Sequence, residues 1–74
     1  MQFKVEYHIY EERTKQGLSI RDLAEKAGIS KTQINDIENG THEATVKTLC
    51  QIAYALNVAP EKLFSFRVSD ISDK

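Results

Sequence analysis

The sequence predicts an all-α fold, a compact bundle of about five short helices. Two short helical patterns meet at Gly28 between residues 20 and 39, and a third apolar stripe recurs at helical spacing over residues 46–56. The 74 residues are 41% hydrophobic and 28% charged, which is typical of one small globular domain. We therefore expect a single domain over residues 1–74, with its core at about residues 6–64 and a C-terminal tail at residues 65–74.

The first helix is expected from about Glu6 to Gln16, with Ile9 facing the core and Gly17 ending it. The two ends of the chain are less regular, because apolar and polar residues alternate at residues 3–7 and 64–68 as they do in strands. Two interpretations stay open for these ends. Either one or both cover an apolar surface, in the same chain or across a dimer, or they fray as tails.

The next helix begins at Ser19, a good N-cap with Asp22 as an acidic residue three positions on. Ala24 stands where two helices would cross, since a small side chain lets their backbones approach. Gly28 then suits a left-handed turn, a conformation that costs about 1–2 kcal/mol for a residue with a Cβ. These signals predict a tight turn into another helix.

That following helix is expected to begin after Ser30, a plausible N-cap. Ile34 and Ile37 are three residues apart and so share its buried face. The opposite face carries hydrogen-bonding side chains, namely Lys31, Thr32, Asn35 and Asp36. Such a face indicates either a surface that enters a DNA groove or a structural helical hairpin whose polar side is simply solvated.

A fourth helix is predicted from Val46 to Leu56, capped by Thr45. Its apolar stripe comprises Val46, Leu49, Ile52, Ala53 and Leu56. Cys50 falls within this pattern, so we expect a buried, inert thiol rather than a redox sensor. A short fifth helix should begin at Pro60 and end near residue 64, with a weak cap because Ala59 precedes the proline.

The stretch from Gly17-Leu18-Ser19 through Ile37-Glu38-Asn39-Gly40 resembles the lambda-repressor-like, Cro/XRE-type helix-turn-helix domains. The later Leu-Cys-Gln-Ile-Ala-Tyr-Ala-Leu-Asn-Val and Pro-Glu-Lys-Leu-Phe segments fit as well, so the resemblance spans about residues 9–64. It implies a five-helix bundle that binds operator DNA, usually as a dimer. It also implies a structural ion pair between Arg13 and Glu38, against the alternative of two independent surface charges.

In a helix-turn-helix, the N-terminal part of the second motif helix contacts base edges. The matching residues are Lys31 for guanine, Thr32 for a hydroxyl or methyl contact, Asn35 for adenine and Asp36 for cytosine N4. Contacts with the DNA backbone are expected from both helix N-termini and from the loop after the motif. These residues are Ile20, Arg21, Ser30, Gln33, Asn39, Thr41 and His42.

Charge weakens this interpretation without removing it. The formal net charge is −1, whereas non-specific DNA affinity comes mostly from neutralising phosphates. The sequence also departs from the family at two places. Ile20 stands where many members have glutamine, and Thr41-His42-Glu43-Ala44 follows Asn-Gly where many have lysine or arginine, with Glu43 unfavourable next to a phosphate. We therefore expect weak non-specific binding and a shallow salt dependence.

Other classes of function find little support. The sequence contains no glycine-rich phosphate loop, nucleophile elbow or paired-histidine motif, so we expect no enzymatic activity. No cofactor, small-molecule ligand or metal is expected, since His8, His42 and Cys50 lack ligand spacing. One cysteine allows no intramolecular disulfide, and no apolar run is long enough to span a membrane. We expect a cytoplasmic, nucleoid-associated protein.

The sequence therefore favours a transcriptional regulator of bacterial or phage type, a repressor that binds an inverted-repeat operator in double-stranded DNA as a homodimer. The alternative is a protein-interaction module, an antitoxin-like or antirepressor partner that has kept the fold and lost the phosphate contacts. The acidic balance favours the alternative, whereas the polar face of the second motif helix favours DNA.

Overall fold

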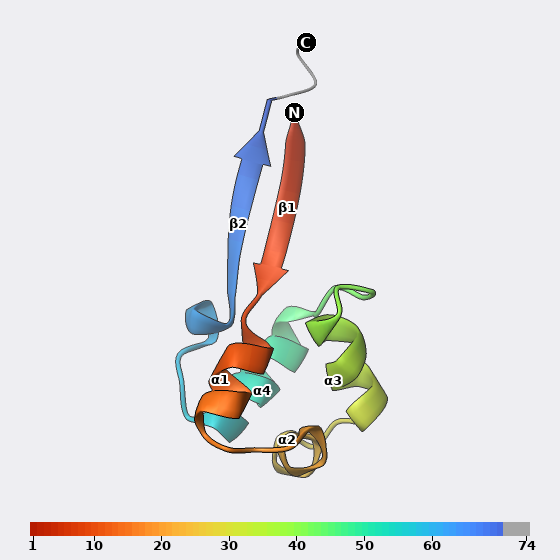
Figure 1. Cartoon of the computed structure of the whole chain (residues 1–74), viewed down its shortest axis with the longest axis vertical. Coiled ribbons are helices and arrows are strands. Elements are labelled where there is room, and N and C mark those ends of the chain that lie inside the picture. Colours follow the sequence, from red (N-terminus) through yellow and green to blue (C-terminus); the bar gives the residue numbers. More distant parts are fainter. Residues whose placement is uncertain (71–74) are drawn as a thin grey trace.

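The computed structural model describes residues 1–70, which form a helical body with a two-stranded ribbon projecting from it (Figure 1). Along the chain, the elements are strand β1 (Gln2–Tyr7), helices α1 (Ile9–Lys15), α2 (Ile20–Ala27), α3 (Lys31–Glu38) and α4 (Val46–Leu56), the 3₁₀ helix η1 (Pro60–Leu63) and strand β2 (Phe64–Ser69). The ribbon makes the molecule long and narrow, with extents of 46 × 22 × 21 Å.

The prediction of an all-α bundle of about five helices is thus confirmed for the helix-turn-helix, but it missed the two-stranded ribbon and is wrong in its helix count. Four α-helices are present in the described chain, and the expected fifth is a 3₁₀ turn at Pro60–Leu63. The first helix begins at Ile9 rather than Glu6, because residues 2–7 are held in a strand. No side chain caps η1, as expected from the alanine at position 59.

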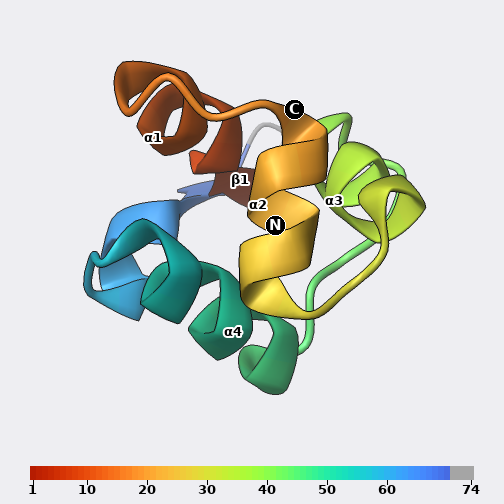
Figure 2. The same ribbon diagram turned by 90° about the horizontal axis from the view of Figure 1, so that it is seen from below.

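The core lies between the helices, and seen from below α2 crosses in front with α1, α3 and α4 arranged around it (Figure 2). Helix α2 packs on both α3 and α4, and η1 packs on α4. Six large side chains are almost fully buried there, namely Ile9, Leu23, Ile34, Ile52, Leu56 and Leu63. Each lies on a different turn or element, so one apolar cluster fixes all the helices relative to one another.

The two chain ends pair with each other. Strands β1 and β2 are antiparallel, and the register places Val5 opposite Phe66. Where the ribbon meets the body, the His8 amide donates to the Leu63 carbonyl at 2.8 Å. The segment expected to be a tail from residue 65 therefore continues a strand as far as Ser69. Residues 71–74 of that expected tail lie outside the described part of the chain.

Val46 of the expected apolar stripe on α4 and the neighbouring Cys50 are not buried. Cys50 is exposed, because it lies about 100° round the helix from Leu49 and so falls outside the buried stripe. Val46 is 77% exposed, since it is the first residue of the helix and extends beyond the core. The rest of the stripe, Leu49, Ile52, Ala53 and Leu56, is buried. The expectation of a buried thiol at Cys50 is therefore wrong.

Candidate nucleic-acid interface

Helix α2, which leads into the turn before α3, is fixed by local hydrogen bonds at both of its ends. At the start of α2, the Asp22 amide donates to the Ser19 hydroxyl at 3.0 Å and the Ser19 amide donates back to the Asp22 carboxylate. At its end, Gly28 is left-handed with φ 74°, and its amide bonds to the Ala24 carbonyl at 2.9 Å. Because both ends of α2 are closed, the direction in which the chain enters α3 is set locally.

Helix α3 begins at Ser30, whose hydroxyl accepts from the Gln33 amide at 3.0 Å. Ile34 and Ile37 face the core and are almost fully buried. The outward face is polar, with Lys31, Thr32 and Asn35 exposed and Asp36 partly exposed. Packing on one side therefore leaves a hydrogen-bonding surface free on the other.

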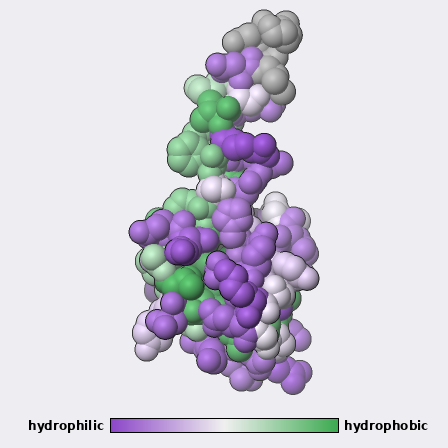
Figure 3. Space-filling model, turned by 60° about the vertical axis from the view of Figure 1, so that its left-hand side comes forward, coloured by the Kyte–Doolittle hydropathy of each residue, from purple (hydrophilic) through white to green (hydrophobic). Residues whose placement is uncertain are grey.

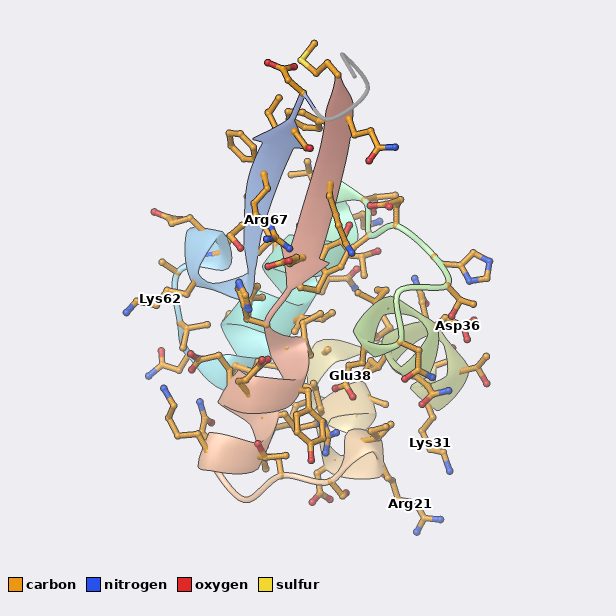
Figure 4. All side chains as sticks on the ribbon, turned by 45° about the horizontal axis from the view of Figure 1, so that its top comes forward. Arg21, Lys31, Asp36, Glu38, Lys62 and Arg67 are labelled. Atoms are coloured by element: carbon orange, nitrogen blue, oxygen red, sulfur yellow. The ribbon has the colours of Figure 1, made fainter. Side chains whose placement is uncertain are left out.

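An open depression joins this outward face to the start of α2. We call it the α2–α3 depression, and its lining residues are Ser19, Ile20, Arg21, Lys31, Thr32 and Asn35. It brings together two expected backbone-contacting residues and three expected base-reading residues. Figure 4 shows Arg21 and Lys31 extending from the same end of the molecule, away from the ribbon. Two cations thus frame a concave surface whose lining includes several hydrogen-bonding side chains.

A second depression lies on the other side of α3, toward the loop that follows it. Here the His42 Nδ1 atom lies 3.2 Å from an Asp36 carboxylate oxygen. The Thr41 amide and hydroxyl both donate to the Asp36 carbonyl, at 2.9 and 3.1 Å. The loop is therefore held against the end of α3 by contacts with both the backbone and the side chain of Asp36.

The remaining expected contact residues are placed less favourably for DNA. Ile20 packs against the core, so its backbone N–H is the group available at the start of α2. The side-chain amide of Gln33 donates to the Thr48 hydroxyl on α4 at 3.5 Å. The Ser30 hydroxyl caps α3 by accepting from the Gln33 backbone N–H. Asn39 is exposed after α3. The expected contact residues whose side chains are free are therefore chiefly those of the α2–α3 depression.

Arg13 and Glu38 form a bidentate ion pair that ties α1 to the end of α3. Arg13 Nε and Nη2 donate to the two Glu38 oxygens at 2.9 and 3.0 Å, and Nη1 donates to the Leu18 carbonyl. Both side chains are at most 10% exposed. The hydrogen bond to Glu38 raises the pKa of Arg13 further above its usual range, against the opposing effect of burial. The pair holds α3 in place and leaves no charge of its own on the outward face.

Sequence reasoning missed a second tie, between the ribbon and the loop after α3. The Tyr7 hydroxyl donates to a Glu43 carboxylate oxygen at 2.7 Å and accepts from the Ala44 amide at 3.0 Å. Burial raises the pKa of Tyr7, and the nearby Glu43 carboxylate raises it further, against the opposing effect of the hydrogen bond from the Ala44 amide. Tyr7 and Glu43 are 36 positions apart, so no local pattern signals this contact.

Within residues 1–70, no three side chains from histidine, cysteine, aspartate and glutamate lie close enough to hold a metal ion. None of the described helices has the length and apolar character needed to cross a membrane.

Comparison with known proteins places this geometry in a family. A helix-turn-helix family model matches residues 9–63. Over 47 residues the chain is 38% identical to an uncharacterised HTH-type transcriptional regulator of Mycobacterium tuberculosis, a match that covers 64% of this chain and 34% of that protein. The chain therefore spans about a third of the length of that curated relative.

Solved structures give the same result. The restriction-modification controller protein C.AhdI from Aeromonas hydrophila is similar with a TM-score of 0.72 and 27% identity, over 74% of this chain and 83% of that one. A variant of the controller protein C.Esp1396I, solved bound to its highest-affinity operator site, is similar with a TM-score of 0.65 and 33% identity, over 69% of this chain and 67% of that one. The chain belongs to the XRE-type helix-turn-helix family.

Proposed function

We propose that this chain is a sequence-specific DNA-binding transcriptional regulator, a repressor that acts as a dimer on an inverted-repeat operator. The observation that carries the proposal is the α2–α3 depression, where Arg21 and Lys31 flank exposed hydrogen-bonding side chains of α3. The likeness to a controller protein solved on its operator supports the same conclusion. Repression would follow from occupying a promoter, in the cytoplasm where DNA is accessible.

In this proposal the first half of α3 enters the major groove. Lys31 donates to guanine O6 or N7, Asn35 makes a paired contact with adenine, and Thr32 contacts a hydrogen-bonding edge or a thymine methyl. Asp36 accepts from cytosine N4, and its carboxylate lies 3.2 Å from His42 Nδ1 in the following loop. Specificity thus rests on a few base contacts made by one short helix.

Phosphate contacts would come from backbone and loop groups more than from cations. The start of α2 offers free N–H groups at Ile20 and Arg21 together with the Arg21 guanidinium, and the positive end of a helix dipole favours an anion there. Asn39, Thr41 and His42 would contribute from the loop, with Ser30 and Gln33 at the start of α3. Few of these groups carry a full charge, so electrostatic affinity should be modest.

Selection of bound sequences from a random DNA pool tests the proposal, first at about 50 mM salt and then at about 150 mM, because phosphate contacts weaken steeply over this range. We expect enrichment of an inverted repeat whose half-sites are about one helical turn apart. A pool that stays random even at the lower salt concentration would contradict the proposal.

The second candidate function is that of a protein-interaction module. It is favoured by the net charge of −1 and by the Thr-His-Glu-Ala loop at residues 41–44, which lacks lysine and arginine. Against it, the outward face of α3 carries no exposed large apolar side chain, although protein-binding surfaces usually have such a patch. An unenriched DNA pool together with a defined protein complex would favour this candidate.

A further inference from the structure

The ribbon of β1 and β2 has two unlike sides. Side chains alternate along a strand, and residues opposite each other in the register lie on the same side. One side carries the pairs Phe3–Val68, Val5–Phe66 and Tyr7–Phe64, and we call it the ribbon face. The other side carries Gln2, Lys4, Glu6, Ser65, Arg67 and Ser69. The ribbon is therefore amphipathic along its whole length.

Only the base of the ribbon face is covered by the body. Tyr7 and Phe64 are partly buried against the core. Farther out, Phe3 is 65%, Phe66 59% and Val68 49% exposed. Figure 3 shows hydrophobic side chains gathered along one side of the projecting ribbon. An apolar surface of this kind on an extension of a small protein indicates a binding site.

Contacts within the ribbon hold this surface in one shape. The Phe3 and Phe66 rings stack with their centroids 5.1 Å apart and an angle of 24° between their planes. On the polar side, Arg67 Nη2 lies 2.6 Å from a Glu6 carboxylate oxygen. Even so, an isolated two-stranded ribbon is only marginally stable in water, and stability comes when a further layer covers its apolar side.

We propose that the ribbon face is the interface through which two copies of this chain associate, with the two faces packed against each other about a two-fold axis. The exposed side chains of the face are uncharged, whereas every charged side chain on β1 and β2 lies on the opposite side. Such a face requires no complementary charge from a partner, and a two-fold interface uses the same patch on both copies. A second copy therefore matches it directly.

The exposed area of the ribbon face suits a small dimer interface. From their exposed fractions, Phe3, Phe66 and Val68 offer roughly 300 Å² of side-chain surface, given about 200 Å² for a whole aromatic side chain. Two copies thus contribute roughly 600 Å² of apolar surface, and the ribbon backbone and polar rim add the rest, so we expect a weak dimer at the low end of specific interfaces, below about 1,200 Å².

The position of the ribbon also suits this role. It projects from the body at the end away from Arg21 and Lys31 (Figure 4), so a partner seated on it leaves the α2–α3 depression open. The use of this dimer to read an inverted repeat rests on the proposed function. The interface itself does not, and it can be measured without DNA.

Sedimentation of the full chain without DNA, from about 1 to 100 μM, tests the interface because this range spans the affinities of modest interfaces. We expect a reversible monomer–dimer equilibrium, and Phe66→Glu should weaken it at least about thirtyfold, as for a residue central to an interface. Lys4→Glu is the matched control, since it adds a negative charge to the opposite side of the same ribbon and should leave the equilibrium unchanged. A monomeric wild type, or a Phe66→Glu variant that dimerises as well as the wild type, would overturn the proposal.

A second variant guards against simple loss of the ribbon in Phe66→Glu. The chain contains no tryptophan, so Phe66→Trp places a single large reporter on the ribbon face. Its emission should shift to the blue over the concentrations at which sedimentation detects the dimer. Emission that does not depend on concentration, or that shifts only with lipid vesicles or an unrelated protein, would overturn the proposal.

The two proposals fail in different ways. A dimer that selects no DNA sequence would contradict the proposed function and leave the interface intact. A monomer that enriches single half-sites would support DNA binding and contradict the interface.

Discussion

Among the single residues, Lys31 gives the sharpest test of the proposed reading surface, because it is the only basic residue of α3 and is exposed in the α2–α3 depression. Lys31→Ala should reduce affinity for the selected operator by roughly 1–3 kcal/mol and leave the melting temperature unchanged. Lys26→Ala is the control, since this exposed lysine of α2 lies instead beside Tyr54 and Asn57. Titration of labelled operator measures both variants, and equal affinities for them would show that α3 does not read the bases as proposed.

The Arg13–Glu38 pair is predicted to matter for stability more than for binding. Glu38→Ala leaves the Arg13 guanidinium buried and without its carboxylate, which should cost about 3–5 kcal/mol in the free energy of unfolding. The comparison is Lys15→Ala, which removes the partner of Glu12 at a side chain that is 69% exposed and should cost at most about 1 kcal/mol. Urea unfolding measures both, and similar small losses would mean that the buried pair is not a structural tie.

At the scale of elements, the turn between α2 and α3 depends on the backbone of Gly28. Its φ is 74°, and an added Cβ would meet no atom within 4 Å. Gly28→Ala should therefore destabilise the fold by about 1–2 kcal/mol through backbone conformation alone. Gly28→Asn should cost less, since asparagine tolerates this region and Asn57 already adopts φ 58° at the end of α4. Thermal unfolding of the pair checks this order, and equal losses would point to packing instead.

Tyr7 joins β1 to the loop after α3, and its contribution should depend on pH. Tyr7→Phe leaves the Ala44 amide and the Glu43 carboxylate without their partner, which should cost about 1–2 kcal/mol at neutral pH. Burial raises the pKa of Tyr7 above its ordinary value of 10.0, so folding favours the neutral phenol. The stabilisation is therefore complete below pH 10 and is lost as the pH rises through the higher folded pKa.

Urea unfolding of the wild type and of Tyr7→Phe, at neutral and at strongly alkaline pH, measures this contribution. The stability difference between the two proteins should shrink above about pH 10, as the linkage requires. A difference that stays constant across this range would show that the phenol proton plays no part. The other tyrosines and lysines titrate in both proteins, so the comparison isolates Tyr7.

How much could be predicted from the sequence varies with the range of the interactions. The caps at Ser19, Ser30 and Thr45 and the turn at Gly28 are local, and their signals lie within a few residues. The strand pair is not local, since Gln2 pairs with Ser69 across almost the whole chain. Alternation indicated two strand-like ends, but pairing and register depend on the folded body bringing those ends together.

The candidate site shows the same division. The outward face of α3 follows from helical spacing, because Ile34 and Ile37 fix which side is buried. The orientations of Gln33 toward Thr48 and of Glu43 toward Tyr7 depend on neighbours 15 and 36 positions away. The exposure of Val46 and Cys50 depends on where the core ends, which the periodicity of a single helix does not reveal.

At the scale of the whole molecule, the described chain separates its surfaces. The two depressions that contain hydrogen-bonding side chains flank α3 in the helical body, and the largest group of exposed apolar side chains lies on the ribbon. A protein built in this way can hold a partner at one end and leave the exposed face of α3 open to solvent at the other. The Tyr7 contact connects the two regions, because it fixes the base of the ribbon to the loop that closes α3.

The charge of the whole molecule leads to the last prediction, on salt. Each neutralised phosphate contributes a slope of about −0.9 to the plot of log affinity against log salt. From Ile20 to Gly40 there are three basic and four acidic residues, and Glu38 is paired with Arg13, so few cations are free to face DNA. We expect a shallow slope, equivalent to roughly three or four phosphates per chain or fewer.

Titrations of the selected operator over a range of salt concentrations measure this slope. Arg21→Gln should reduce the slope by about one unit, and Lys26→Gln should leave it unchanged. A slope that requires six or more phosphates per chain would mean that DNA contacts residues well outside the α2–α3 depression, which would place the interface elsewhere on the body.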